Sequence, residues 1–233
     1  MKGGKHGQKA KLRREDITSV DFFYDPLCPF AFAASLWIRE VARSSSFQLD
    51  FRFFSLEEVN LEAGKRHPWE RDWSYGFSLM KLAWLIKQQD PALADRFYLE
   101  VGSAIHLHGE QIHTPEHAAH FVEAIGLDRS LVQKSMRSKK AEEAVRADHV
   151  FLVERFGGFG VPTLVLNDSI PVFGPVVMPA PTKNQAVELF DTVLAFASMP
   201  NLLELKRPRD KQANVDLARE LAPYLKGRVW RSV

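Results

Sequence analysis

Cysteine is almost missing from this chain, because Cys28 is the only one among its 233 residues. A single cysteine excludes a framework of intramolecular disulfides. An excess of charge of one sign is missing too, since 31 basic and 29 acidic side chains leave a net charge of +2. This balance gives no support for a dedicated nucleic-acid binder, so we expect no nucleic-acid partner.

Long apolar runs are absent as well. No run approaches the roughly 18 apolar residues of a transmembrane helix, so we expect no membrane partner. The basic start, residues 1–14, is not followed by the apolar core of a signal peptide. We therefore expect a cytoplasmic protein, and we interpret residues 1–15 as a disordered basic tail. A hydrophobic content of 45% is enough for a full core in the remainder.

The one cysteine lies where a predicted strand turns into a predicted helix. The apolar and aromatic residues 20–24 indicate a buried strand, which the pair Asp25-Pro26 ends. Helix formers follow at residues 31–42, with Pro29 suited to the first turn. Because the unpaired amides and the dipole of a helix start favour negative charge, we expect a lowered pKa and a reactive thiolate at Cys28. The alternative is a free cysteine packed as a small apolar residue.

Apolar periodicity changes twice along the rest of the chain. Residues 47–54 alternate as a strand does, and the order strand, helix, strand implies a right-handed crossover and a parallel pair. Helical spacing then dominates from residue 57 to residue 150, a block too long for a loop. Strand character returns at residues 163–166, with 170–173 as a hairpin partner, and residues 183–197 have the apolar face of a helix packed on a sheet.

This layout resembles the DsbA family within the thioredoxin-like fold. More narrowly, residues 25–30, Asp-Pro-Leu-Cys-Pro-Phe, resemble the Asp-Pro-Leu-Cys-Pro-Trp motif of mycothiol-dependent nitroreductases and related predicted disulfide isomerases of actinobacteria. Three further segments resemble the same proteins in the same order: Ile105-His106 with Gly109, Phe173-Gly174-Pro175-Val176, and Leu203-Glu204-Leu205-Lys206-Arg207. The resemblance covers roughly residues 18–208.

The resemblance implies an α/β protein with a thioredoxin-like fold and a large all-helical, DsbA-like insertion. The expected parts are a basic tail at residues 1–15, a thioredoxin-like domain made of residues 16–56 and 151–205, a helical insertion at residues 57–150, and a C-terminal extension at residues 206–233 with a short helix near residues 214–225.

The resemblance also assigns the site. Cys28 is the expected nucleophile, and the proline of Val161-Pro162 is expected to be cis and to lie against it. A cis X-Pro bond costs only about 0.5–1 kcal/mol, although a trans proline opening an edge strand is the alternative. The residues implied in binding substrate or thiol are Pro29, Phe30, His106, Val161, Pro162 and Thr163.

One position departs from the family pattern. Many relatives carry Cys-X-X-Cys, whereas the fourth position here is Ala31. Without a second cysteine, chemistry at Cys28 must be resolved by an external thiol. We therefore predict an enzyme, a thiol-dependent oxidoreductase that uses one nucleophilic cysteine and a low-molecular-weight, mycothiol-type thiol as co-substrate to reduce a small-molecule or disulfide substrate.

Two other functions stay open. A relative of the kappa-type glutathione transferases or 2-hydroxychromene-2-carboxylate isomerases would share the layout, but those proteins tend to use serine where Cys28 stands. A non-catalytic binding or chaperone protein with a degenerate site is the other. The sequence identifies neither the substrate nor the oligomeric state.

Two clusters of ring side chains raise further hypotheses. The densest group of histidines does not have the spacing of a standard zinc motif, so we expect no metal; its members are His106, His108, His113, His117 and His120. Trp69, Trp73 and Trp84 fall at helical spacing around a helix predicted over residues 70–89. We interpret them as core of the helical block, with an aromatic lid over a flat substrate as the alternative.

Overall fold

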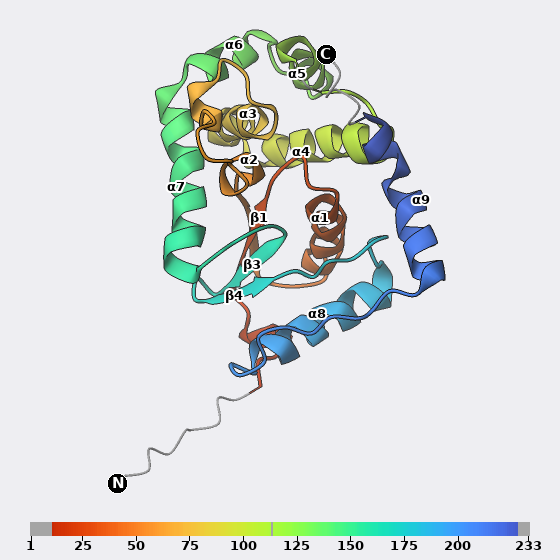
Figure 1. Cartoon of the computed structure of the whole chain (residues 1–233). Coiled ribbons are helices and arrows are strands. Elements are labelled where there is room, and N and C mark those ends of the chain that lie inside the picture. The colour runs from red at the N-terminus through yellow and green to blue at the C-terminus, as the bar shows by residue number, and fades with distance from the viewer. Residues whose placement is uncertain (1–10, 113, 228–233) are drawn as a thin grey trace.

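A mixed four-stranded sheet lies at the centre of the structure, a computed structural model that describes residues 11–112 and 114–227 (Figure 1). The strand order is β2-β1-β3-β4. β1 (Ser19–Tyr24) runs parallel to β2 (Gln48–Phe53) and antiparallel to β3 (Thr163–Leu166), which pairs antiparallel with β4 (Ile170–Phe173). The predicted parallel pair and the predicted hairpin are therefore confirmed.

The hairpin turn between β3 and β4 is fixed to the start of β1. Asn167 and Asp168 have φ angles of 47° and 56°, a left-handed conformation that these two residue types tolerate and that tight hairpin turns require. The Oδ1 atom of Asn167 also accepts the N–H of Thr18 at 2.8 Å. The turn chemistry and this side-chain bond together set where β3 pairs with β1.

Alternate side chains of β1 face two different helical layers. Tyr24 stacks on Tyr98 of α4 (Pro91–His106) with ring centroids 3.9 Å apart. Phe23 points the other way and stacks on Phe151 of α7 (Lys139–Phe156), at 6.3 Å. Since successive side chains of a strand point to opposite faces, β1 is covered on both, which explains why residues 20–24 are almost continuously apolar.

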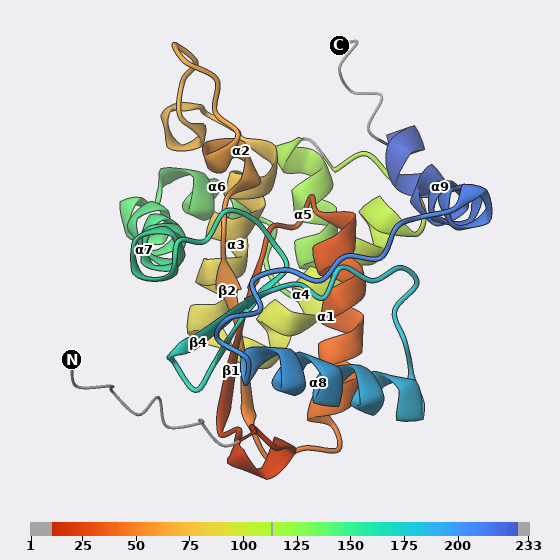
Figure 2. The same cartoon turned by 60° about the horizontal axis from the view of Figure 1, so that its bottom comes forward.

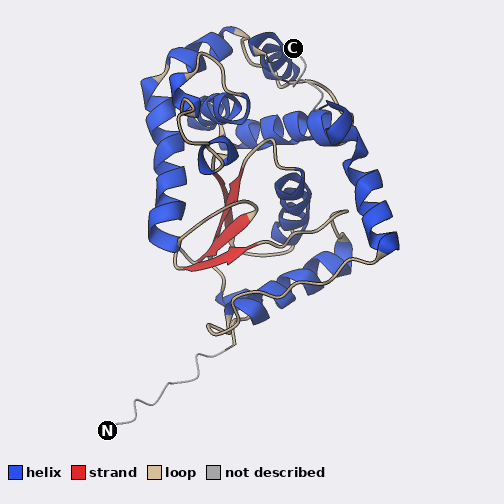
Figure 3. Ribbon diagram, viewed as in Figure 1, coloured by secondary structure: helices blue, strands red, loops and turns tan. Residues whose placement is uncertain are grey.

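Two helices outside the helical block pack together beside the sheet. In α1 (Pro29–Ala42), the indole N–H of Trp37 donates to the carbonyl of Ala186 in α8 (Lys183–Ala197) at 2.8 Å. The ring of Trp37 also lies 6.2 Å from that of Phe190. Figure 3 shows the result, a short sheet enclosed by helices. The α8 helix predicted over residues 183–197 is confirmed.

The described residues between β2 and β3 form helices and loops. In chain order the helices are α2 (Leu56–Val59), the 3-10 helix η2 (Pro68–Glu70), α3 (Tyr75–Gln89), α4, α5 (Pro115–Ala124), α6 (Ser130–Arg137) and α7. The predicted all-helical insertion is therefore confirmed. The helix predicted over residues 70–89 begins only at Tyr75, because Pro68 starts a separate turn and Glu57 holds the Ser74 hydroxyl and the Phe77 amide.

The two ends differ from the sequence prediction in extent. Residues 1–10 of the predicted tail lie outside the described residues, and residues 14–16 form a 3-10 turn, η1 (Arg14–Asp16). The C-terminal helix α9 (Lys211–Gly227) is longer than the predicted one and includes Pro223. Among the described helices, none is both long and apolar enough to cross a membrane. The division into domains stays a prediction.

Candidate active site

Cys28 is the residue at which β1 gives way to α1. A backbone hydrogen bond from the Cys28 amide to the Asp25 carbonyl, 3.0 Å, closes the turn that Pro26 begins. Cys28 then caps α1, with Pro29 as the first helical residue. Its sulfur accepts the Ala31 amide at 3.4 Å, in the place where a serine or aspartate oxygen usually caps a helix. The sequence therefore directs the sulfur to the unpaired amides of the helix start.

A second segment, 133 residues further along the chain, lies against the same sulfur. The thiol donates to the Val161 carbonyl at 3.5 Å, and the Val161-Pro162 bond is cis. The segment is held from both sides, because the Thr163 hydroxyl donates to the Gly160 carbonyl and the Pro162 carbonyl accepts the Gly174 amide, each at 2.8 Å. The structure thus places the Val161 carbonyl against the sulfur of Cys28, with the cis Pro162 and Thr163 next in the chain, and their role in binding substrate or thiol stays a prediction.

The expected low pKa of Cys28 is wrong for this conformation. Cys28 is only 7% exposed. This burial raises the pKa of its thiol to about 11, whereas the hydrogen bond from the Ala31 amide lowers the pKa by less. Removing an ionised sulfur from water costs more than the amides of Ala31 and Phe30 at the helix start return. In the conformation seen here, Cys28 is a neutral thiol that donates to Val161.

His106 lies on the other side of the cysteine turn, at the end of α4. Its Nε2 atom is 2.8 Å from the carbonyl of Pro26. A carbonyl only accepts, so Nε2 carries the proton and Nδ1 is left as an acceptor. The ring is 4% exposed and lies 5.2 Å from that of Phe32. Burial lowers the pKa of His106 to about 4, so the imidazole is neutral at pH 7.

Comparison of the sequence with known protein families gives a match over most of the chain. The Rv2466c-like family, described as mycothiol-dependent nitroreductase Rv2466c, matches residues 27–207. The chain belongs to this family. It is also 43% identical over 218 residues to the uncharacterized protein Rv2286c of Mycobacterium tuberculosis (strain ATCC 25618 / H37Rv), a match that covers 93% of this chain and 94% of the relative.

Solved structures place this Rv2466c-like chain among thioredoxin-fold proteins. The probable DsbA oxidoreductase SCO1869 of Streptomyces coelicolor superimposes with a TM-score of 0.57 at 18% identity, covering 83% of this chain and 94% of the other. The thiol-disulfide exchange protein alpha-DsbA2 of Wolbachia pipientis gives 0.54 at 17% identity, covering 82% and 84%. These likenesses show the fold. Together with the family they confirm the predicted DsbA-like architecture and a thiol-dependent oxidoreductase as the class of enzyme.

Ala31 occupies the place of the second cysteine in this Rv2466c-like chain. It is fully buried in the first turn of α1, and Cys28 is the only cysteine in the sequence. The methyl group of Ala31 adds neither a thiol nor an acid to the site. Its backbone amide is nevertheless part of the site, because that amide donates to the sulfur.

The two residues that flank the cysteine on its helical side are more open. Pro29 and Phe30 are each partly exposed, unlike Cys28 itself. Phe30 stands where the family motif quoted above has tryptophan. An aromatic side chain at the rim of the site suits contact with an apolar part of a substrate, and its role in binding stays a prediction.

Asp25 is a site residue that sequence analysis names only as part of the motif. Its carboxylate is fully buried and accepts the amides of Leu27 and Leu56, at 2.9 and 2.8 Å. Gly76 approaches so closely that a Cβ there would lie 2.6 Å from Asp25 Oδ1. Burial raises the pKa of Asp25 to about 7, although the hydrogen bonds from the two backbone amides act to lower it. The sequence feature that could have identified Asp25 is an acidic side chain directly after a buried strand and three residues before the cysteine.

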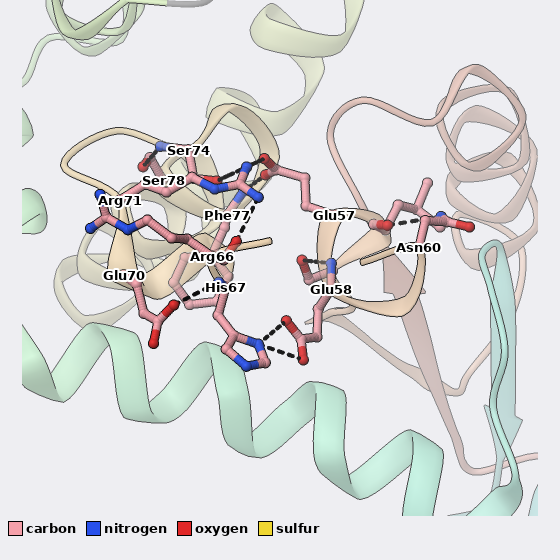
Figure 4. Close-up of polar contacts among 12 residues, drawn as sticks. Glu57, Glu58, Asn60, Arg66, His67, Glu70, Arg71, Ser74, Phe77 and Ser78 are labelled. Atoms are coloured by element: carbon pink, nitrogen blue, oxygen red, sulfur yellow. Dashed lines mark hydrogen bonds and ion pairs between the residues drawn. The ribbon is translucent and has the colours of Figure 1, made fainter. Parts of the chain in front are cut away.

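Next to Leu56, which Asp25 binds, a polar network around Glu57 joins α2 to the start of α3 (Figure 4). The residue after Leu56, Glu57, accepts the Ser74 hydroxyl at 2.7 Å and the Phe77 amide at 3.0 Å, and pairs with Arg71 at 3.2 Å. Asp25 therefore ties the cysteine turn to α2, and Glu57 ties α2 to the start of α3. These two carboxylates are therefore part of the set of contacts that holds the helical block beside the cysteine turn, together with the bond from His106 to Pro26.

The histidine cluster and the tryptophans have simpler surroundings. His108, His117 and His120 are exposed, and His113 lies outside the described residues. Within the described ranges, no group of three or more His, Cys, Asp or Glu side chains is arranged to hold a metal ion. All three tryptophans pack against the hydrophobic core while staying partly exposed. Trp69 lies between the His67 ring, 4.6 Å away, and the Arg146 guanidinium of α7, 4.3 Å away.

Proposed function

We propose that this protein is a one-cysteine oxidoreductase that reduces a small disulfide or another small oxidised substrate at the expense of an external low-molecular-weight thiol. The supporting observation is the position of the Cys28 sulfur, between the first amides of α1 and the carbonyl of Val161. The name of the matched family suggests a thiol of the mycothiol type as co-substrate. We further propose that the protein works in the cytoplasm, where such thiols are kept reduced.

For a disulfide substrate the proposed reaction has two exchanges at Cys28. The Cys28 thiolate attacks one sulfur of the substrate, a bond forms between the two sulfurs, and the other half of the substrate leaves as a thiolate. The external thiol, as thiolate, then attacks the substrate-derived sulfur of this mixed disulfide and releases Cys28. These two exchanges leave a mixed disulfide between the second half of the substrate and the external thiol. A second external thiol then attacks this mixed disulfide, releases the second half of the substrate as a thiol and forms the disulfide of the external thiol, so two external thiols supply the two electrons.

The surrounding residues have separate roles in this proposal. When the thiol loses its proton, its bond to the Val161 carbonyl is lost and the bond from the Ala31 amide becomes stronger, because the acceptor is then charged. The free Val161 carbonyl can then accept a donor of the substrate, in the orientation that Pro162 and Thr163 fix. Pro29 and Phe30 provide the partly open rim, and His106 contributes a neutral ring to the wall.

The burial of Cys28 favours one competing function. A cysteine that never leaves its buried, protonated state would fit a binding protein with a degenerate site, and the raised pKa of Cys28 points in that direction. A measurement of turnover distinguishes the binding protein from the oxidoreductase. We expect purified protein to catalyse reduction of a small aromatic disulfide by mycothiol or by a substitute such as cysteine, with a rate that depends on the concentration of that thiol.

The control is Cys28→Ser, which keeps a capping side chain and removes the sulfur. We expect this variant to lose activity to the uncatalysed rate while its unfolding transition stays close to that of the natural protein. Equal rates for Cys28→Ser and the natural protein would sink the proposal and leave the binding protein as the better account.

A further inference from the structure

Helix α9 lies beyond the segment that the family model matches. The matched segment ends at residue 207, and α9 spans Lys211–Gly227. The connection from α8 runs over the surface, with Leu203 88% and Leu205 82% exposed. Figures 1 and 2 both place α9 beside the C-terminal end of α4, where His106 lies. Helix α9 thus returns to the neighbourhood of the cysteine turn.

The last turn of α9 meets the loop after α4 backbone to backbone. A Cβ on Gly227 would lie 2.8 Å from the carbonyl oxygen of Gly109, and a Cβ on Gly109 would lie 2.5 Å from that of Pro223. Neither obstruction is the end of a flexible side chain, so neither could move aside cheaply. Both positions need glycine for this approach, and Gly109 needs it also for its φ of +66°.

Tyr224, in the same turn, covers His106. The two rings lie 5.3 Å apart at 42°. His106 in turn lies against Phe32 and donates to the Pro26 carbonyl, two residues before Cys28. Among the described residues, Nδ1 of His106 is a buried acceptor with no hydrogen-bond partner. A buried acceptor in this state costs free energy, so the closed arrangement holds a group that a ligand could satisfy.

The rest of α9 is only weakly held. Gly227 is its one buried residue, while Val215 and Leu225 are exposed. Elements with few buried apolar contacts open at low free energy compared with the whole molecule. Opening of α9 without unfolding of the sheet is therefore physically accessible.

From these contacts we propose that α9 is a C-terminal cover of the thiol site, closed by Tyr224 on the His106 ring, and that it must move before a substrate or thiol reaches Cys28. The substrates that fit are those with a hydrogen-bond donor for Nδ1 of His106. The functional meaning of the cover rests on the proposed function, but access to Cys28 can be measured without turnover.

The test is the rate at which iodoacetamide alkylates Cys28 in the full chain, followed by intact mass at one pH. Tyr224→Ala removes the covering ring. Gly227→Ala adds a Cβ that the Gly109 backbone obstructs, and it does not weaken the helix, because alanine is the better helix former. Each variant should speed alkylation about fivefold or more, as expected if roughly 1 kcal/mol of docking is lost.

Two controls separate opening of the cover from general loss of stability. Val215→Ala changes an exposed residue of the same helix, and Leu189→Ala removes a partly buried side chain from α8. We expect both to alkylate at the natural rate. A faster rate in Tyr224→Ala or Gly227→Ala with unchanged controls supports the cover, even if the protein proves to have no turnover. Unchanged rates in both test variants, or equal acceleration in Leu189→Ala, would overturn it.

Discussion

At the scale of single residues, the sulfur of Cys28 is subject to two opposing influences. The first amides of α1 favour a thiolate, and burial favours the thiol. The balance seen here is that of a closed site in which the thiol donates to Val161. Any opening that admits water reduces the cost of the charge and leaves the amides in place, so activation of Cys28 is coupled to access.

This balance gives a prediction for the free protein. The rate of alkylation of Cys28 should rise with pH toward a midpoint above that of an ordinary cysteine, about 8.5, because the thiolate is formed only at the cost of burial. Measurement of the alkylation rate between about pH 6 and pH 11 by intact mass would show it. A midpoint clearly below the ordinary value would mean that the helix start outweighs burial after all.

Asp25 and His106 affect stability with opposite dependence on pH. Burial raises the pKa of Asp25 from 3.8 to about 7, so its protonated form stabilises the fold fully below about pH 4, and that contribution is lost as the pH rises toward 7. Burial lowers the pKa of His106 from 6.5 to about 4. Its neutral form therefore contributes fully above about pH 6.5, and that contribution is lost as the pH falls toward 4.

The Asp25→Asn variant should keep the contribution of His106 to the pH dependence of the free energy of unfolding and lack that of Asp25. Between about pH 4 and pH 7, the free energy of unfolding of the variant should rise relative to that of the natural protein by on the order of 4 kcal/mol, because only the natural protein loses the Asp25 contribution. Urea denaturation across this range measures the difference, with Glu62→Gln at an exposed carboxyl as control. Parallel profiles for Asp25→Asn and the natural protein would show that Asp25 does not hold its proton.

At the scale of elements, Glu57 is the side chain through which α2 holds the start of α3. Glu57→Ala leaves the Phe77 amide, the Ser74 hydroxyl and the Arg71 guanidinium without their shared acceptor. We expect a loss of about 2–3 kcal/mol in the free energy of unfolding, since buried donors then go unpaired. Chemical denaturation measures it, with the neighbouring exposed Glu62→Ala as the matched change. Equal stabilities of the two variants would refute the role of Glu57.

Elements defined by local pattern are the ones that the sequence predicts well. Residues 20–24, 163–166 and 170–173 are strands because their apolar runs and the Asn-Asp turn act locally. The prediction of a low pKa for Cys28 is wrong because the residues that bury the thiol, such as Val161, are far away in the sequence. The contacts of Asp25 with Leu56 and Gly76, and of α9 with Gly109, likewise join distant parts of the chain that no local pattern connects.

At the scale of the whole molecule, Asp25, Glu57 and helix α9 together enclose the cysteine turn. Asp25 and Glu57 fix the helical block to the cysteine turn, and α9 returns over the end of α4 to close the opposite side. Substrate access would then depend on α9 rather than on movement of the network around Glu57. In this account the protein has one thiol, which is protected until the cover opens and which depends on an outside thiol for release.

The central claim is that Cys28 works alone, and one measurement tests it most directly. The protein is treated with a small disulfide and its intact mass is followed, before and after a low-molecular-weight thiol is added. We expect the natural protein to keep the adduct of half the disulfide until the thiol arrives, and Ala31→Cys to lose two hydrogens and keep no adduct, because a second thiol now lies in the same helical turn. A natural protein that never acquires the adduct, or that releases it with no thiol present, would contradict the account.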